Sequence, residues 1–104
     1  VMIYEDGYCD GPPVQLVVTN QWACSAPPKC GCSATSNGST TVYQDYTCID
    51  DVAAFTASQF GSAPYLVVEH YVEGTRCSTQ QGAVVFRADG ECYYNAAGGT
   101  SFRI

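Results

Sequence analysis

Apolar and β-branched residues occur in short runs along this chain, and glycine, proline or aspartate separates most runs from the next. Runs of this length and composition predict β-strands bounded by turns. We expect seven strands, at residues 1–5, 14–19, 40–47, 65–73, 83–88, 91–95 and 100–104. The pattern therefore predicts a mainly β fold.

One segment departs from the strand pattern. Asp51 precedes Val52, and apolar residues then recur at helical spacing as far as Phe60, which Gly61 follows. An aspartate at the N-cap and a glycine after the last turn are usual boundaries of an α-helix. We expect one short amphipathic helix near residues 51–60.

A tight turn is indicated between two of the predicted strands, at Asp89-Gly90. Both central residues of a type I′ turn need positive φ, and Asp-Gly is one of the preferred pairs. The sequence therefore predicts a β-hairpin that joins residues 83–88 to residues 91–95.

Two pairs of cysteines repeat one spacing. Cys9 and Cys24 are 15 positions apart, and so are Cys77 and Cys92, so a shift of 68 places one pair on the other. The repeat suggests that each pair forms a disulfide. Each such bridge would stabilise the domain by about 2 to 4 kcal/mol.

The apolar neighbours follow the same shift, because residues 16–18 then coincide with residues 84–86. Matched spacing and matched apolar runs favour an internal duplication. We therefore expect a disulfide-stapled β-sandwich or Greek-key-like domain, built from two pseudo-duplicated halves at about residues 1–24 and 67–95.

A Ser-, Thr-, Pro- and Gly-rich stretch at residues 25–41 predicts a long exposed loop within a single domain, residues 1–104. Its Asn37-Gly38-Ser39 is an N-glycosylation sequon. Asn37 is therefore a candidate site for a covalent glycan, and such sequons are used in secreted proteins.

Composition excludes several functions. Four Lys and Arg stand against ten Asp and Glu, a net charge of −6, which disfavours binding to nucleic acid or to anionic lipid. No apolar run approaches the roughly 20 residues that a membrane span needs. Seven cysteines and a start at Val1 instead of methionine indicate a processed or excised segment of a secreted or cell-surface protein.

Candidate chemistry is sparse. The single histidine, His70, shares a strand face with Leu66 and Val68, and no nucleophile-elbow motif is present, so we expect no enzymatic activity. The spacing of Cys30 and Cys32 is too short for a usual zinc site, so we expect neither metal nor cofactor. One of these two cysteines is expected to pair with Cys48, which leaves one thiol over.

Residues 1–11 resemble the opening of a βγ-crystallin Greek-key motif, with a tyrosine followed by glycine. Residues 37–41 and 95–101 look like degraded forms of that family's calcium signature. Ala96 and Ala97 stand where acidic or Asn ligands would be expected. The resemblance therefore supports a β architecture without calcium.

A second resemblance covers nearly the whole chain, and is to a cysteine-rich extracellular repeat of oomycetes. In that family the repeat occurs in secreted proteins and in ectodomains that precede a tyrosine-kinase-like domain. The resemblance implies no enzymatic activity, and it marks Cys32 as the odd thiol. It rests on the order of Tyr4-Glu5-Asp6-Gly7, Cys9, Cys24, Cys30, Cys48 before Asp51, Phe60-Gly61, residues 65–74, Cys77 and Asp89-Gly90-Glu91-Cys92.

Strand-like sequences lie at both ends of the chain. Terminal strands can add to the sheet of a neighbouring molecule. We therefore expect a structural protein that assembles with copies of itself into a fibre or surface coat, through Val1, Ile3, Ser101, Phe102, Arg103 and Ile104. The alternative is a module that binds a glycan or surface ligand on exposed Trp22, Tyr43 and Tyr46.

Overall fold

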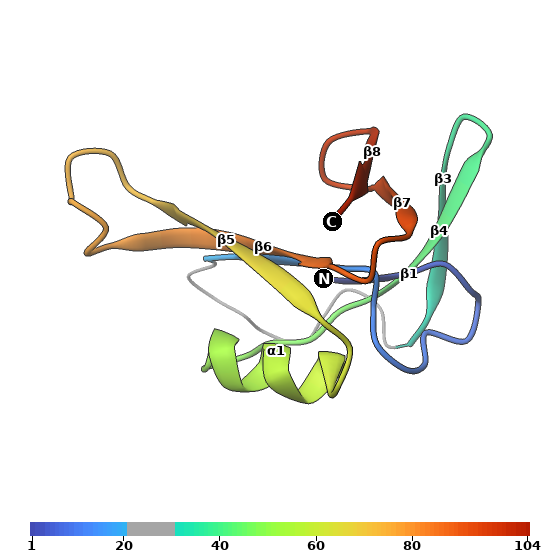
Figure 1. Ribbon diagram of the computed structural model, residues 1–104, viewed down its shortest axis with the longest axis horizontal. Coiled ribbons are helices and arrows are strands. Elements are labelled where there is room, and N and C mark those ends of the chain that lie inside the picture. Colours follow the sequence, from blue (N-terminus) through green and yellow to red (C-terminus); the bar gives the residue numbers. More distant parts are fainter. Residues whose placement is uncertain (21–30) are drawn as a thin grey trace.

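The computed structural model describes residues 1–20 and 31–104, and it is mainly β (Figure 1). Six antiparallel strands form one sheet, in the order β3-β4-β1-β2-β6-β5. Their bounds are β1 Met2–Tyr4, β2 Gln15–Thr19, β3 Ser33–Asn37, β4 Thr40–Asp45, β5 Tyr65–Tyr71 and β6 Gln80–Arg87. A second, two-stranded sheet contains β7 Cys92–Asn95 and β8 Thr100–Arg103.

The helix, α1 (Val52–Phe60), has the predicted boundaries. The Asp51 carboxylate accepts a hydrogen bond from the Ala54 N–H at 3.0 Å, which is N-cap geometry. Gly61 ends the helix with a φ of 57°, a value that favours glycine, and its N–H bonds to the Ala57 carbonyl. Local chemistry therefore determines this element.

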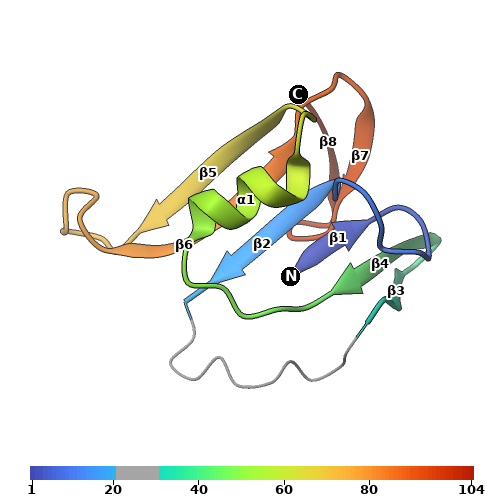
Figure 2. The ribbon, with the colours of Figure 1, turned by 90° about the horizontal axis from the view of Figure 1, so that it is seen from below.

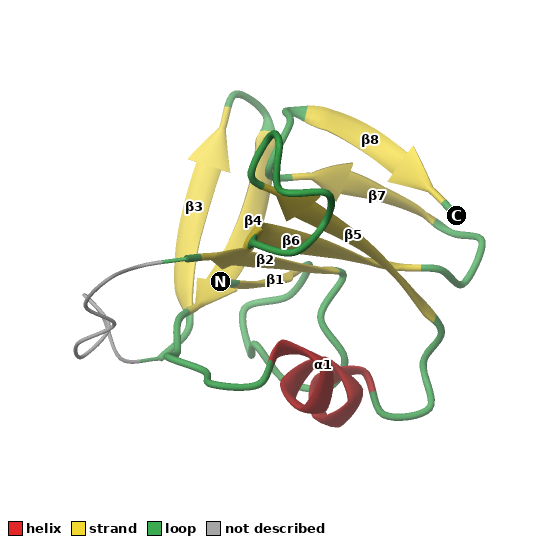
Figure 3. Ribbon diagram, turned by 90° about the vertical axis from the view of Figure 1, so that its left-hand side faces the viewer, coloured by secondary structure: helices red, strands yellow, loops and turns green. Residues whose placement is uncertain are grey.

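Each face of the large sheet is covered in part (Figure 3). Helix α1 lies under one face, where fully buried Phe60 packs in a cluster with Met2, Tyr4, Leu16 and Val85. The β7–β8 hairpin lies over the other face. There the buried cluster consists of Ile3, Val14, Val42 and Tyr93, with Phe102 packed against it.

Gln15 ties the β7–β8 hairpin to the large sheet. Its side chain is fully buried, its Nε2 donates to Asn95 Oδ1 at 2.7 Å, and its Oε1 accepts from the Ala96 N–H at 3.1 Å. Both partners lie at the end of β7. A buried amide is stable only with such partners, so Gln15 fixes the position of the hairpin.

All seven predicted strands are present within a few residues of their expected ends, and one further strand, β3, was not predicted. It lies in the expected loop 25–41 and pairs with β4 through a tight turn at Gly38, whose φ is 64°. Its sequence has no apolar alternation, which is why the pattern missed it. Residues 25–30 of that expected loop lie outside the described residues.

The prediction of a β-hairpin at Asp89-Gly90 is wrong, although a turn is present there. Strand β6 lies between β2 and β5, so neither of its edges is open to β7. The Asp89 carboxylate accepts hydrogen bonds from the Glu91 N–H at 3.1 Å and from the Tyr93 hydroxyl at 2.6 Å. The turn therefore carries the chain from one sheet into the other.

The disulfides also differ from the expected pattern. Cys9 bonds to Cys32, so the expected Cys9–Cys24 bridge is wrong and Cys32 is not the odd thiol. The bridge links the β1–β2 connection to the chain just before β3. Cys48 is disulfide-bonded as well, while Cys24 and Cys30 lie outside the described residues.

Cys77 and Cys92 are exposed, and neither is bonded to any residue that the structure describes, so the expected bridge between them is also wrong. Cys77 precedes β6 and Cys92 follows it. An extended strand of this length separates its ends by about 25 Å, far beyond the Cα separation of a disulfide. Equal sequence spacing did not correspond to equal geometry.

The two expected halves do form similar antiparallel pairs, β1–β2 and β5–β6, but a duplication is not shown. The expected shift aligns Leu16 with Val84. Leu16 lies directly opposite Val85, so these two share a face, and Val84 points to the other face. The alignment therefore places core residues on opposite sides of the sheet.

Candidate functional site

The outer strand β5 is the candidate site, because its apolar side chains are exposed on both faces. Consecutive residues Tyr65, Leu66, Val67 and Val68 have exposed fractions of 38%, 46%, 38% and 39%. Figure 2 shows β5 along the margin of the sheet, beside β6 and to one side of α1. An exposed apolar edge strand favours addition of another strand.

The backbone groups that β5 offers follow from its pairing. The Ala88 N–H bonds to the Pro64 carbonyl at 2.9 Å, which identifies these two residues as a hydrogen-bonded pair. Hydrogen-bonded and non-bonded pairs alternate along an antiparallel ladder. In the register of β5 and β6, the residues bonded toward β6 are then Leu66, Val68 and His70.

The residues between them direct their N–H and C=O groups away from β6. These are Tyr65, Val67 and Glu69. The pairing of β6 with β2 is consistent with this assignment. The Arg87 N–H bonds to the Val14 carbonyl, so Arg87 and every second residue of β6 direct their backbone groups toward β2, and the residues between them direct theirs toward β5. Among the described strands, none pairs along this outer side of β5.

The regular part of the edge has two clear ends. Pro64 precedes β5 and has no N–H to donate. At the other end the register with β6 shifts between His70 and Tyr71, an irregularity that alters the twist of an edge. A partner strand can therefore follow the edge from Pro64 to His70.

The polar end of β5 is organised by one hydrogen bond. The Tyr71 hydroxyl donates to Glu69 Oε2 at 2.5 Å, and this bond raises the pKa of Tyr71. His70 is exposed and shares a face with Leu66 and Val68, as the alternation predicts. The edge is thus apolar in its first half and polar in its second.

The opposite outer strand, β3, has different chemistry. Its sequence is Ser-Ala-Thr-Ser-Asn, with Ala34, Thr35 and Ser36 exposed. The Ser36 and Thr41 hydroxyls lie 3.0 Å apart and hydrogen-bond across the hairpin. Asn37 is the last residue of β3, directly before the turn, and its glycosylation stays a prediction.

The expected assembly residues at the N-terminus are not available to another copy. Strand β1 lies between β4 and β2, so both of its edges are paired within the chain. Ile3 is 2% exposed, and the Val1 ammonium donates to the Val17 carbonyl at 2.7 Å. The expectation that Val1 and Ile3 add to a neighbouring sheet is therefore wrong.

The expected assembly residues at the C-terminus differ in their exposure. Phe102 packs inward, with its ring centroid 4.8 Å from that of Phe86. Ser101, Arg103 and Ile104 are exposed. Among the described strands β8 pairs with β7, so its other edge remains accessible.

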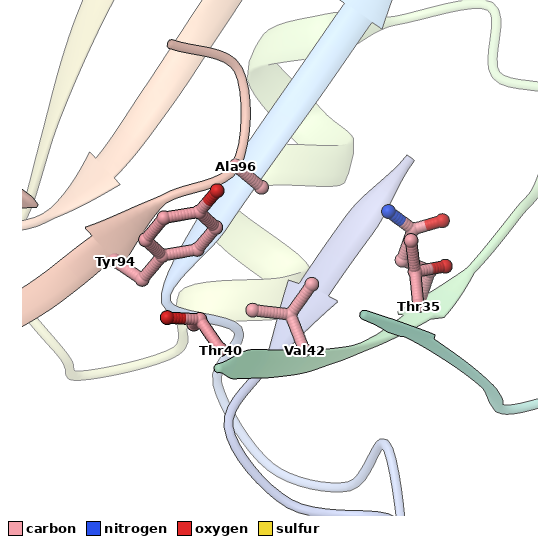
Figure 4. Close-up of a pocket in the computed structure, with 6 residues that line it drawn as sticks. Thr35, Thr40, Val42, Tyr94 and Ala96 are labelled. Atoms are coloured by element: carbon pink, nitrogen blue, oxygen red, sulfur yellow. The ribbon is translucent and has the colours of Figure 1, made fainter. Parts of the chain in front are cut away.

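A shallow groove is a second candidate site (Figure 4). Its volume is about 280 Å³, and β3 and β4 form one side while the end of β7 and the turn after it form the other. Figure 4 shows the Tyr94 ring and Ala96 facing Thr40 and Val42. The lining residues are Thr35, Thr40, Val42, Gln44, Tyr94 and Ala96.

The aromatic residues predicted as a binding platform do not form one in the described part of the chain. Trp22 lies outside the described residues. Tyr43 is half-buried and packs against the cluster that α1 covers. The Tyr46 hydroxyl donates to Gln44 Oε1 at 2.7 Å, next to the groove. Tyr94, which sequence analysis did not single out, is the aromatic residue at the groove.

Sequence analysis also missed β5 as a surface. Four consecutive apolar residues at 65–68 are typical of a central strand with both faces buried. The one sequence signal that distinguishes β5 is the polar Glu69-His70 in its second half, and this signal is equally compatible with ordinary strand alternation. Edge position depends on the order of strands, which no local pattern contains.

In the part of the chain that the structure describes, no three His, Cys, Asp or Glu side chains gather where they would hold a metal ion. Among the same residues, no helix has the length and apolar character to cross a membrane. No family model, curated protein or solved structure matches this chain.

Proposed function

We propose that this domain is a non-enzymatic structural module of the extracellular space or cell surface, which associates with other copies of itself through the outer edge of β5. The observation that carries the proposal is the exposed run at residues 65–68. Soluble proteins usually protect such edges with charges, proline or a covering segment. Residues 65–68 include neither a charge nor a proline, and no described strand pairs along their outer side.

Two kinds of interaction are available at this edge together. The backbone groups of Tyr65, Val67 and Glu69 point outward and can bond to another strand. The side chains of Leu66 and Val68 on one face, and of Val67 on the other, lose water contact when a strand is added. Main-chain bonds and apolar contact together are the basis of recognition by strand addition.

An extracellular location is supported by the cysteines. The Cys9–Cys32 disulfide and the disulfide of Cys48 are typical of proteins from an oxidising compartment. The sequon residue Asn37 lies on β3, at the other end of the strand order from β5. A glycan at Asn37 would therefore leave the β5 edge open.

Sedimentation velocity tests the proposal. The intact domain should sediment as a dimer or larger species, and the proportion should rise with protein concentration. The variant Val67→Lys places a charge in the middle of the exposed run and should sediment as a folded monomer. The matched control is Thr35→Lys on exposed β3, which should leave the association unchanged.

A monomeric intact domain at high concentration would refute the proposal. Equal effects of Val67→Lys and Thr35→Lys would also refute it, because association would then depend on charge alone. Circular dichroism of each variant should show an unchanged β spectrum, which excludes unfolding as the cause.

The groove supports a second candidate function, the binding of a saccharide. Threonine hydroxyls and the Gln44 amide can hydrogen-bond to sugar hydroxyls, and Tyr94 supplies an aromatic face. Such a combination of a few polar groups and an apolar wall is common in ligand sites. Glycan-array binding that Thr40→Val and Tyr94→Ala both reduce would favour this function.

A further inference from the structure

We infer that two copies pair antiparallel along β5 about a two-fold axis at Val67, so that their two sheets become continuous. The inference rests on the proposed self-association and specifies its geometry. It follows from the backbone groups that point outward, from the limits of the regular edge, and from the side chains that each register brings together.

Symmetry restricts the registers that are available. In a continuous antiparallel pair, residues directly opposite each other share a face of the sheet. A two-fold axis perpendicular to the sheet makes each face of one copy continuous with the same face of the other copy. Residues that lie opposite each other must then belong to the same face, so the axis passes through a residue position and not between two residues. The candidates within the regular edge are Val67, Val68 and the positions on either side of them.

The limits of the edge select Val67. The regular segment runs from Pro64 to His70, and its central residue is Val67. Only an axis at this centre allows the whole segment of one copy to face the whole segment of the other. The groups that point outward then form about six backbone hydrogen bonds, two at each hydrogen-bonded pair.

The same axis matches apolar side chains. Val67 lies opposite the partner copy's Val67 on the face that α1 covers. Leu66 lies opposite the partner copy's Val68 on the other face, in a non-bonded pair whose side chains approach closely. All the side chains in the middle of the contact are apolar, and all are exposed in the single chain.

Charge favours the same register. With the axis at Val67, Glu69 faces Tyr65, and the two Glu69 carboxylates are about 14 Å apart along the strands. That separation exceeds the screening length of about 10 Å at 0.1 M salt. With the axis at Glu69 the two carboxylates would lie directly opposite, which is destabilising.

The axis at Val68 is the nearest competitor. It places Val67 opposite Glu69 and Leu66 opposite His70, so both apolar residues face polar ones. It also moves the contact toward the irregularity after His70. This register therefore loses both the pairing of apolar side chains with each other and the regular backbone geometry of the edge.

Cysteine cross-linking tests the register. The background should be Cys77→Ser with Cys92→Ser, because these exposed thiols would otherwise react. Residues in a hydrogen-bonded pair have Cα atoms about 5.5 Å apart, within the range of a disulfide. Val67→Cys should therefore give a disulfide-linked dimer on mild oxidation, with a yield at least tenfold above that of Glu69→Cys.

The two failures are distinguishable. A domain that sediments as a dimer, but cross-links through Glu69→Cys or Val68→Cys better than through Val67→Cys, overturns the register and leaves the proposed function standing. An intact domain that sediments as a monomer overturns both, and would direct attention to a partner strand from another protein.

Proline substitutions supply a check that needs no cysteine. Val67→Pro removes an N–H that points away from β6, so the single chain should keep its fold while the dimer is lost. Val68→Pro removes an N–H that bonds toward β6, so it should lower the melting temperature of the single chain. Dimerisation that survives Val67→Pro would overturn the inference.

Discussion

Replacement of Gln15 by methionine should detach the β7–β8 hairpin from the large sheet. Methionine has nearly the same length and volume, so Gln15→Met removes two hydrogen bonds without creating a large cavity. The lost bonds are those to Asn95 Oδ1 at 2.7 Å and from the Ala96 N–H at 3.1 Å. Asn95 Oδ1 and the Ala96 N–H then each lose their hydrogen bond to the side chain at position 15.

The expected loss of stability is about 2 to 3 kcal/mol. Each hydrogen bond contributes on the order of 1 kcal/mol net, and a donor left unpaired in a partly buried site adds to the cost. Because 1 kcal/mol shifts the melting temperature of a domain of this size by about 4 to 8 °C, the midpoint should fall by roughly 10 to 20 °C.

Thermal melts followed by circular dichroism measure the total effect, and hydrogen exchange locates it. Amides of β7 and β8 should exchange faster in Gln15→Met, while those of β2 and β6 should change less. The control is Gln81→Met, the same change at an exposed position on β6, which should cost no more than about 0.5 kcal/mol. Equal stability of the two variants would refute the role assigned to Gln15.

Three further results are expected. Thr56→Val should raise the free energy of unfolding by about 1 kcal/mol in denaturant titrations, because the buried Thr56 hydroxyl has no hydrogen-bond partner among the described residues. A neutral or negative effect would show that the hydroxyl is satisfied. Alkylation of the native protein before digestion should label Cys77 and Cys92, and non-reducing peptide maps should join Cys9 to Cys32; a Cys77–Cys92 peptide would contradict the structure. Burial raises the pKa of Tyr4, and the Asp45 and Asp10 carboxylates raise it further, so its contribution to stability is complete below pH 10 and is lost as the pH rises through the folded-state pKa. Tyr4→Phe should remove that part of the alkaline loss, and identical pH profiles would refute the assignment.

Local chemistry explains which parts of the fold could be predicted. The boundaries of α1 follow from Asp51 and Gly61, which act within one turn of the helix. Seven strands follow from β-branched runs and turn residues. β3 could not be predicted, because its polar sequence becomes a strand only through pairing with β4.

The missed features all depend on residues that are distant in sequence. The turn at Asp89 leads out of the large sheet because β2 and β5 already occupy both sides of β6. The Cys9–Cys32 bridge depends on where β3 begins. The candidate site had the same limitation, since the run at 65–68 differs from a core strand only in having no outer neighbour among the described strands.

In the proposed association, the unequal outer strands of the large sheet determine how far assembly can proceed. β5 is apolar at its outer side, whereas β3 is polar and carries the sequon. A chain that can pair with a copy of itself along only one sheet edge has a valence of one, so assembly stops at a closed dimer. The C-terminal residues that were expected to mediate assembly lie on or next to β8, and no described strand pairs along the outer edge of β8. If it also self-paired, the valence would be two and closed pairs would join into a linear polymer. Substitutions at Ser101 or Arg103 would then control polymer length, while substitutions at Val67 would control whether any association occurs.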